Sequence, residues 1–437
     1  MAGAARTRFI QINRAFCPAV TQLPKRGNIM NYKFLENGSV TSPLGFVAGG
    51  VIAGIKPNNT TKRDLGMIFC EKPCAAAAIF TKNRVKSDTI YVTREHLKNG
   101  VAQAVIVNSG NANACNPDGY DKAEQMCALA AEALGIAQDD VIVASTGVIG
   151  QALPIAPIEK SVAALKDSMT KDGGTYAAEA IMTTDTVKKE WAVQLTLGGK
   201  TVTIGGIAKG SGMIHINMGT TLSFVTTDAA ISADMLHEAL IEAADVSYNM
   251  VSVDGDTSTN DTLAIMASGL AGNEEITVKN ADYALFVEAL TAAFKSVAKK
   301  LAADGEGATK LVIGKVSGAK DEATAKVIAK SVICSSLVKA AMFGADANCG
   351  RILCAIGYSG AEVDVKKIDV SYRSAKGEIL VCKDGMGLAF DEDKAKEILL
   401  ESEIDIIIKL GDGTGEAEAY GCDLTYDYVK INGDYRT

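Results

Sequence analysis

The residues with the clearest chemical potential lie around the bond between Gly219 and Thr220, almost at the midpoint of the 437 residues. A Gly-rich turn at 209–212 precedes this bond, and the apolar run 222–225, typical of a strand, follows it. The Thr hydroxyl can attack the preceding carbonyl only if no side chain blocks it, and Gly219 has none. Cleavage would leave Thr220 with a free α-amine, which can serve as the nucleophile's own general base. Because an α-amine titrates near about 8, a useful fraction is neutral at cellular pH.

A Thr in an ordinary strand is the competing interpretation of this position, since Thr is common in strands. The residues on either side of 220 leave both interpretations open. A wider comparison along the chain is needed to choose between them.

The segment 209–218 reads KGSGMIHINM, and Gly219, Thr220, a hydrophobic run and TTDA at 226–229 follow. It resembles the central signature KGSGMI-x-x-NMAT of the glutamate N-acetyltransferases, also called ornithine acetyltransferases, the self-cleaving enzymes of arginine biosynthesis. Further segments resemble the same family in the same order: 107–114, 145–150, 182–186, 304–310 and 422–432. The resemblance extends over residues 30–437, which chance rarely produces, and it favours Thr220 as the nucleophile.

The resemblance also implies which groups surround the nucleophile. Thr146 and Gly147 correspond to the family's oxyanion hole, in which one donor can be worth about 2.7–4 kcal/mol in the transition state. Thr183, Lys209 and Glu306 correspond to substrate-contacting positions. Lys209 would pair with the substrate's α-carboxylate and Glu306 with a substrate ammonium.

Two residues near the end of the chain, Asn432 and Thr437, correspond to C-terminal binding positions of the family. Without the resemblance, simpler interpretations compete with each of these roles. The segment 146–147 would be an ordinary turn at a strand end, lone charges would be solvated, and the tail would be frayed.

Three residues depart from the family pattern close to the predicted cleavage site. Gly219 replaces the usual Ala, Ile216 stands where Pro is frequent, and Thr221 stands where Met is frequent. Gly219 is smaller and more flexible than Ala, so attack stays feasible from a less preorganised backbone. Thr221 adds a second hydroxyl beside the first, but the spacing of Thr220 from Lys209 is the one that matches the family.

The implied activity is a ping-pong transfer of acetyl from N2-acetyl-L-ornithine to L-glutamate through an acetylated Thr220. The cycle implies no cofactor, and an additional use of acetyl-CoA as a substrate stays open. Two rival hypotheses remain. An N-terminal-nucleophile amidohydrolase or aminopeptidase would use water in place of glutamate, and an unprocessed binding protein would have no activity.

The implied fold is an α/β sandwich of two halves, of the N-terminal-nucleophile-like type. It would be cut into an α chain, 30–219, and a β chain, 220–437, that assemble as a heterotetramer of two α and two β chains. The residue pattern itself alternates strands and helices. We expect strands at 104–107, 141–144, 191–197, 201–204, 222–225 and 311–313, and helices at 121–134, 233–244, 286–301 and 321–338.

The composition is that of an ordinary globular protein, with 48% hydrophobic residues, 42 Gly and 8 Pro. A net charge of −8 argues against nucleic acid or an anionic membrane surface as the main partner. No apolar run approaches the roughly 18 residues of a membrane-spanning helix. The ten scattered Cys indicate free thiols in a reducing compartment.

Several other sites are not indicated by the sequence. Cys70 and Cys74 are too isolated for a zinc site. The segments 254–256 and 260–261 lack the spacing of a Ca²⁺ loop and are interpreted as turns. No nucleotide-binding signature occurs. Of the three His, only His215 lies near Thr220 and is a candidate base.

The first 29 residues stand apart because they contain basic residues and no acidic one. This balance resembles a transit peptide, although Ser is absent. We favour the alternative that the family-like chain starts at Met30 and that the preceding part is a misassigned start or a disordered arm. The expected location is the cytoplasm, or the mitochondrial matrix if residues 1–29 are a transit peptide.

Overall fold

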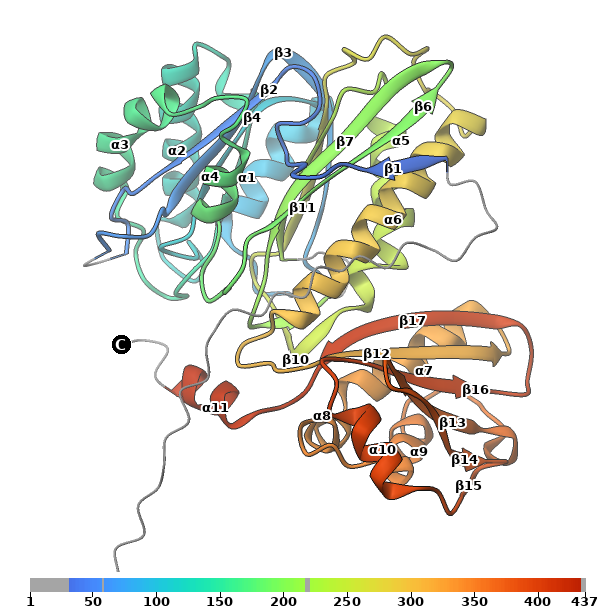
Figure 1. The fold of residues 1–437 in the computed structure, drawn as a ribbon. Coiled ribbons are helices and arrows are strands. Elements are labelled where there is room, and N and C mark those ends of the chain that lie inside the picture. Colours follow the sequence, from blue (N-terminus) through green and yellow to red (C-terminus); the bar gives the residue numbers. More distant parts are fainter. Residues whose placement is uncertain (1–30, 57–58, 217–220, 434–437) are drawn as a thin grey trace, which may run out of the picture. The chain divides into compact units, whose positions relative to one another are not determined.

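Residues 31–56, 59–216 and 221–433 are described by the computed structural model of this chain (Figure 1). They form a mixed α/β fold around one large sheet and one smaller sheet. The large sheet has nine strands in the order β1-β6-β7-β9-β11-β3-β4-β5, with β2 paired to β3. Its strands are β1 (Tyr32–Phe34), β2 (Phe46–Val51), β3 (Leu65–Phe80), β4 (Val101–Asn108), β5 (Val141–Ser145), β6 (Lys189–Leu197), β7 (Lys200–Lys209), β9 (Leu222–Thr227) and β11 (Thr262–Ala267).

Strand β3 joins two halves of this sheet. Its first part pairs with β2 and β4, its last part pairs with β11, and the pairing with β4 shifts register between Phe69 and Cys74. Apolar residues of both halves, such as Val105 on β4 and Phe224 on β9, share one buried cluster. The two halves therefore face each other across a common core. The expected α/β sandwich is confirmed.

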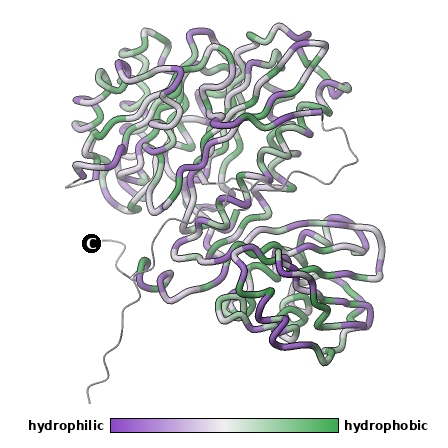
Figure 2. The backbone as a smooth tube through the Cα atoms, viewed as in Figure 1, coloured by the Kyte–Doolittle hydropathy of each residue, from purple (hydrophilic) through white to green (hydrophobic). Residues whose placement is uncertain are grey.

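Helices cover the outer face of each half. Helices α1 and α2 pack on β4 and β5, and α3 packs on β2, β3 and α2, through a second buried cluster, whereas α5 and α6 pack on the half that contains β6. Figure 2 shows hydrophobic and hydrophilic residues alternating along the tube, as expected of elements with one buried face. The helices are α1 (Asp88–His96), α2 (Gly119–Leu134), α3 (Ile155–Asp167), α4 (Gly174–Ala180), α5 (Ala233–Asp245) and α6 (Ala281–Ala303).

The remaining elements follow α6 or lie in a small two-stranded sheet. The second, six-stranded sheet has the order β15-β14-β13-β16-β12-β17. Its buried apolar residues belong to the same cluster as those of α5 and α6. The strands of this second sheet are β12 (Leu311–Ala319), β13 (Asp369–Ser374), β14 (Gly377–Lys383), β15 (Met386–Gly387), β16 (Glu403–Lys409) and β17 (Gly415–Cys422). The two-stranded sheet consists of β8 (Ile214–His215) and β10 (Ser252–Thr257). The helices are α7 (Glu322–Cys334), α8 (Ser336–Phe343), α9 (Cys349–Gly357), α10 (Glu392–Leu399) and α11 (Tyr426–Gly433).

Two predictions of local structure are wrong. The single helix expected at 321–338 is two helices, because Ser335 leaves the helical conformation and its side chain accepts a hydrogen bond from the N–H of Val338 at the start of α8. The segment 254–256 is not a turn. It belongs to β10, where the Asp254 carboxylate accepts hydrogen bonds from the backbone of Met213 and Ile214.

The other expected strands and helices are present, with boundaries that differ by a few residues. The predicted cleavage site separates β7 from β9, yet these two strands pair directly. Residues on both sides of that site thus belong to one sheet. Over the described ranges, no helix combines the length and apolar character needed to cross a membrane.

Candidate active site

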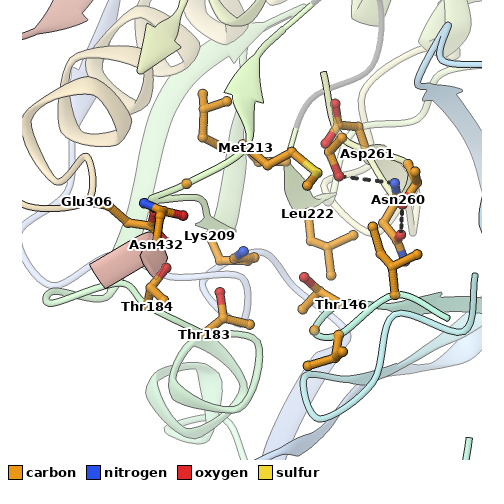
Figure 3. A pocket seen from close by; sticks show the side chains of 18 residues that line it. Thr146, Thr183, Thr184, Lys209, Met213, Leu222, Asn260, Asp261, Glu306 and Asn432 are labelled. Carbon is orange, nitrogen blue, oxygen red and sulfur yellow. Dashed lines mark hydrogen bonds between the residues drawn. The ribbon is translucent and has the colours of Figure 1, made fainter. Parts of the chain in front are cut away.

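One pocket collects most of the residues that the sequence singled out. Its cavity volume of about 320 Å³ lies at the lower end of the range of about 300–1,000 Å³ for small-molecule sites. Figure 3 shows Lys209 between Glu306 and Asn432 on one side and Thr146 on the other. The lining residues include the predicted Thr146, Gly147, Thr183, Lys209, Glu306 and Asn432, together with Thr184, Met213, Thr221, Leu222, Asn260 and Asp261.

The turn that carries Thr146 and Gly147 begins where β5 ends. The N–H of Thr146 donates to the carbonyl of Asn108 at 2.9 Å, and Asn111 forms isolated bridges with Thr146 and Val148. Gly147 has φ +134°, and a Cβ atom there would lie 2.8 Å from the backbone nitrogen of Asn111. This backbone conformation and this close approach both require Gly.

The opposite wall carries the two charged groups. Lys209 is the last residue of β7, and no described residue forms a hydrogen bond or an ion pair with its ammonium group. Glu306 follows α6 and accepts a hydrogen bond from Nδ2 of Asn432 at 2.8 Å. Both charged side chains are buried, at 7% and 6% exposure. Because a buried charge needs a partner, a ligand with a carboxylate and an ammonium group would satisfy this pocket.

A buried ion cluster holds this wall in place. Lys189, which is fully buried, lies 2.7 Å from Asp185 and 2.6 Å from Asp304. Asp185 also accepts hydrogen bonds from the N–H groups of Thr183 and Gly210, and the carbonyl of Asp304 accepts one from the hydroxyl of Ser211. The cluster thus connects the three segments that supply Thr183, Lys209 and Glu306.

Two carboxyl groups near Lys209 have opposite pKa shifts. Burial alone would raise the pKa of Asp185, but Lys189 and Lys209 outweigh it and hold the pKa at about 2. Burial raises the pKa of Asp261 well above the usual carboxyl range, and a contact with Ser258 and the charge of Lys209 oppose this only in part. Asp185 is therefore an anion at neutral pH, whereas burial favours the neutral form of Asp261.

The sequence did not single out Asn260 and Asp261 as site residues, because the segment 260–261 was interpreted as a turn. Its position directly before the apolar strand β11 was the available signal. The hydroxyl of Thr221, a departure from the family pattern, lies in the pocket wall. It is buried and has no hydrogen-bond partner in the part of the chain that the structure describes. A bound molecule could use it.

Gly219, Thr220 and Thr437 lie outside the described residues. The segments on either side of 217–220 both reach the pocket, through Met213 and Ile214 before it and through Thr221 and Leu222 after it. The roles proposed for Thr220 and its partners stay predictions.

His215 is not among the residues that line the pocket. Its Nδ1 lies 3.1 Å from Oγ of Ser252, and burial followed by the charge of Lys330 lowers its pKa to about 4. It is therefore neutral at pH 7. No group of three or more His, Cys, Asp or Glu in the described ranges is arranged to hold a metal ion.

Comparison with known proteins gives consistent matches. The ArgJ family matches residues 47–437. The "Arginine biosynthesis bifunctional protein ArgJ" of Symbiobacterium thermophilum is 51% identical over 401 residues, which cover 92% of this chain and 99% of that protein. The crystal structure of the Bacillus halodurans protein of the same name has 46% identity over 48% of this chain and 97% of that chain, with a TM-score of 0.46. The structure of ornithine acetyltransferase from Mycobacterium tuberculosis complexed with ornithine has 38% identity over 43% of this chain and 99% of that chain, with a TM-score of 0.40.

The sequence matches and the α/β sandwich define an acetyltransferase of arginine biosynthesis. The chain belongs to the ArgJ family. Of the activities that the sequence left open, this membership selects the acyltransferase over the hydrolase and over the inactive binding protein.

Proposed function

We propose that this protein transfers acetyl from N2-acetyl-L-ornithine to L-glutamate after cutting its own chain between Gly219 and Thr220. The observation that carries the proposal is the pocket, because it unites Thr146, Gly147, Lys209 and Glu306 with residues that directly follow Thr220. The pocket thus offers hydrogen-bond donors, a cation and an anion within one small cavity. A zwitterionic amide substrate requires these same groups.

Self-cleavage begins when the hydroxyl of Thr220 attacks the carbonyl carbon of Gly219. The C–N bond breaks as the amine leaves, and the chain is then joined by an ester between Gly219 and the Thr220 oxygen. Water hydrolyses this ester, which leaves a carboxylate on Gly219 and both a free hydroxyl and a free α-amine on Thr220. That amine is the general base for transfer.

Acetyl transfer then occurs in two half-reactions. The Thr220 oxygen attacks the acetyl carbon of acetylornithine while the α-amine accepts the hydroxyl proton. The N–H of Gly147 and the hydroxyl of Thr146 stabilise the resulting oxyanion. The C–N bond breaks and the proton passes to the departing ornithine amine. In the second half-reaction, the amine of glutamate attacks the acetyl ester, the C–O bond breaks, and Thr220 regains its proton.

The charged wall selects the substrate in this scheme. Lys209 pairs with the α-carboxylate, which acetylornithine and glutamate share, and Glu306 pairs with the ammonium group of ornithine. Thr183, Asn432 and Thr437 complete the binding residues. An assembly of two α and two β chains in the cytoplasm, and acetyl-CoA as a further donor, belong to the same proposal.

Product formation with and without the acceptor tests this function. Purified protein is incubated with acetylornithine and glutamate at varied concentrations, and ornithine and N-acetylglutamate are quantified. We expect equimolar products and parallel lines in double-reciprocal plots. Continuous ornithine release without glutamate would instead identify a hydrolase.

A further inference from the structure

The side chain of Asn260 connects two parts of the pocket. Its Nδ2 donates to the carbonyl oxygens of Ala112 and Ser145, both at 2.6 Å. Its Oδ1 accepts a hydrogen bond from the hydroxyl of Thr259 at 2.6 Å. Asn260 is only 5% exposed, so loss of one of these hydrogen bonds would leave a buried polar group without a partner.

The two carbonyls flank the turn of the proposed oxyanion hole. Ser145 is the residue immediately before Thr146, and the N–H of Ala112 donates to the carbonyl of Val148, just after Gly147. Asn260 therefore holds the entry of the turn and the loop that pairs with its exit. The Ser145 carbonyl and the N–H of Thr146 belong to one planar peptide unit. A rotation of that carbonyl would therefore break the hydrogen bond from the N–H of Thr146 to Asn108 and displace the Thr146 side chain.

The backbone after Asn260 is fixed to the nucleophile strand. Thr262 pairs with Leu222 at the start of β9, and the N–H of Thr262 donates to the carbonyl of Thr221 at 3.1 Å. Only Asp261 separates Asn260 from this pair. The carboxamide thus connects the strand that follows Thr220 with the turn that carries Thr146 and Gly147.

We propose that Asn260 is a positioning residue for acetyl transfer, which aims the N–H of Gly147 and the hydroxyl of Thr146 at the acetyl oxygen of a substrate bound to Thr220. This inference rests on the proposed function. It predicts that a change at Asn260 slows acetylation of the enzyme more than it weakens binding of acetylornithine. The reason is that the oxyanion exists only in the transition state and intermediate.

Asn260→Asp tests the inference with little change in shape. It replaces the donor of both hydrogen bonds by an oxygen that repels the two carbonyls. Asn260→Ser removes the donors without adding charge and serves if the first variant does not fold. Asn273→Asp is the matched control. Asn273 is 7% exposed, and its Nδ2 also donates to two carbonyls, those of Ala230 and Glu274, outside the pocket.

The readout is the single-turnover rate of Thr220 acetylation by acetylornithine, normalised to the amount of cleaved chain, with the apparent Kd from the same titration. For Asn260→Asp we expect a rate at least about tenfold lower, since one misplaced oxyanion donor costs up to about 10²–10³ in rate. The apparent Kd should stay within about threefold, because this donor acts on the transition state. Asn273→Asp should retain the wild-type rate even if its melting temperature falls as far as that of Asn260→Asp.

Three results would overturn the inference. Acetylation of both Asn260 variants at the wild-type rate would show that the turn holds its own position. An equal slowing of Asn273→Asp would attribute the effect to general destabilisation. If the wild-type enzyme itself gains no acetyl group, the proposed function fails and this inference fails with it.

Discussion

Lys189 and Asp304 form an ion pair of 2.6 Å that joins residues on opposite sides of the proposed cleavage site. The Lys189 side chain is completely buried and that of Asp304 almost so. The pair connects the start of β6 with the turn that ends α6 and leads to Glu306. It therefore supports the pocket, and after the proposed self-cleavage it would join two separate chains.

Replacement of Lys189 by Met should strongly destabilise the protein. It leaves the carboxylates of Asp185 and Asp304 buried without their cation. Removal of one partner from a buried ion pair lowers the free energy of unfolding by about 3–5 kcal/mol. Urea unfolding of wild type and variant measures the difference. Lys279→Met is the control, since Lys279 is exposed and its ion pairs are with Glu238 and Glu242 at the surface. Similar unfolding midpoints for the two variants would contradict this role of the cluster.

Glu306→Gln should impair the two half-reactions unequally. Acetylornithine carries a side-chain ammonium group for Glu306, whereas glutamate carries a carboxylate there. Loss of a charge-assisted hydrogen bond of about 1.5–3 kcal/mol corresponds to a roughly tenfold to hundredfold loss in the donor half-reaction. The acceptor half-reaction, measured by rapid mixing of pre-acetylated enzyme with glutamate, should change much less. Equal losses of rate in both half-reactions would show that Glu306 does not bind the ammonium group of the substrate.

Gly212→Ala should act through Glu306. A Cβ atom at Gly212 would lie 2.3 Å from the carboxyl carbon of Glu306, so the carboxylate must move. We expect the KM for acetylornithine to rise roughly tenfold, which corresponds to about 1.5 kcal/mol of a charge-assisted contact. Gly357→Ala is the control, because no atom lies within 4 Å of its added Cβ. An unchanged KM for Gly212→Ala would show that the carboxylate position is unimportant.

The stability of the protein should fall between pH 6.5 and pH 4 partly through His215. Burial first and then Lys330 lower its pKa to about 4, while the unfolded chain titrates near about 6.5. In this window the unfolded state binds a proton that the folded state does not bind, so the free energy of unfolding decreases as the pH falls. His215→Gln should therefore lose less stability between pH 7 and pH 4.5. Parallel curves for the two proteins in urea titrations would refute the assignment.

The sequence predicted the elements whose residue patterns are local. The apolar runs at 104–107 and 141–144 are buried strands, and the resemblance located the residues of the pocket around Lys209. The helix expected at 321–338 failed at Ser335, where one hydroxyl hydrogen bond starts a new helix. Such a cap depends on the direction of the following chain, which local periodicity does not encode.

The contacts that hold the pocket were harder to predict. Lys189 has the sequence context of a surface lysine, and its two partners are 4 and 115 residues away. Asn260 reaches Ser145 across 115 residues because β3 pairs with β4 in one half of the sheet and with β11 in the other. No spacing rule in one sequence contains this pairing. The positions of Thr220 and Thr437 lie outside the described residues, so their roles stay predictions.

Intact mass spectrometry tests the central claim most directly. Purified wild-type protein is measured before and after mixing with N2-acetylornithine alone, beside Thr220→Ala. We predict two fragments for wild type, with one acetyl group gained by the fragment that begins at Thr220, and a single uncut chain without acetyl for Thr220→Ala. An uncut wild-type chain, or a Thr220→Ala chain that is cut and acetylated normally, would contradict the account.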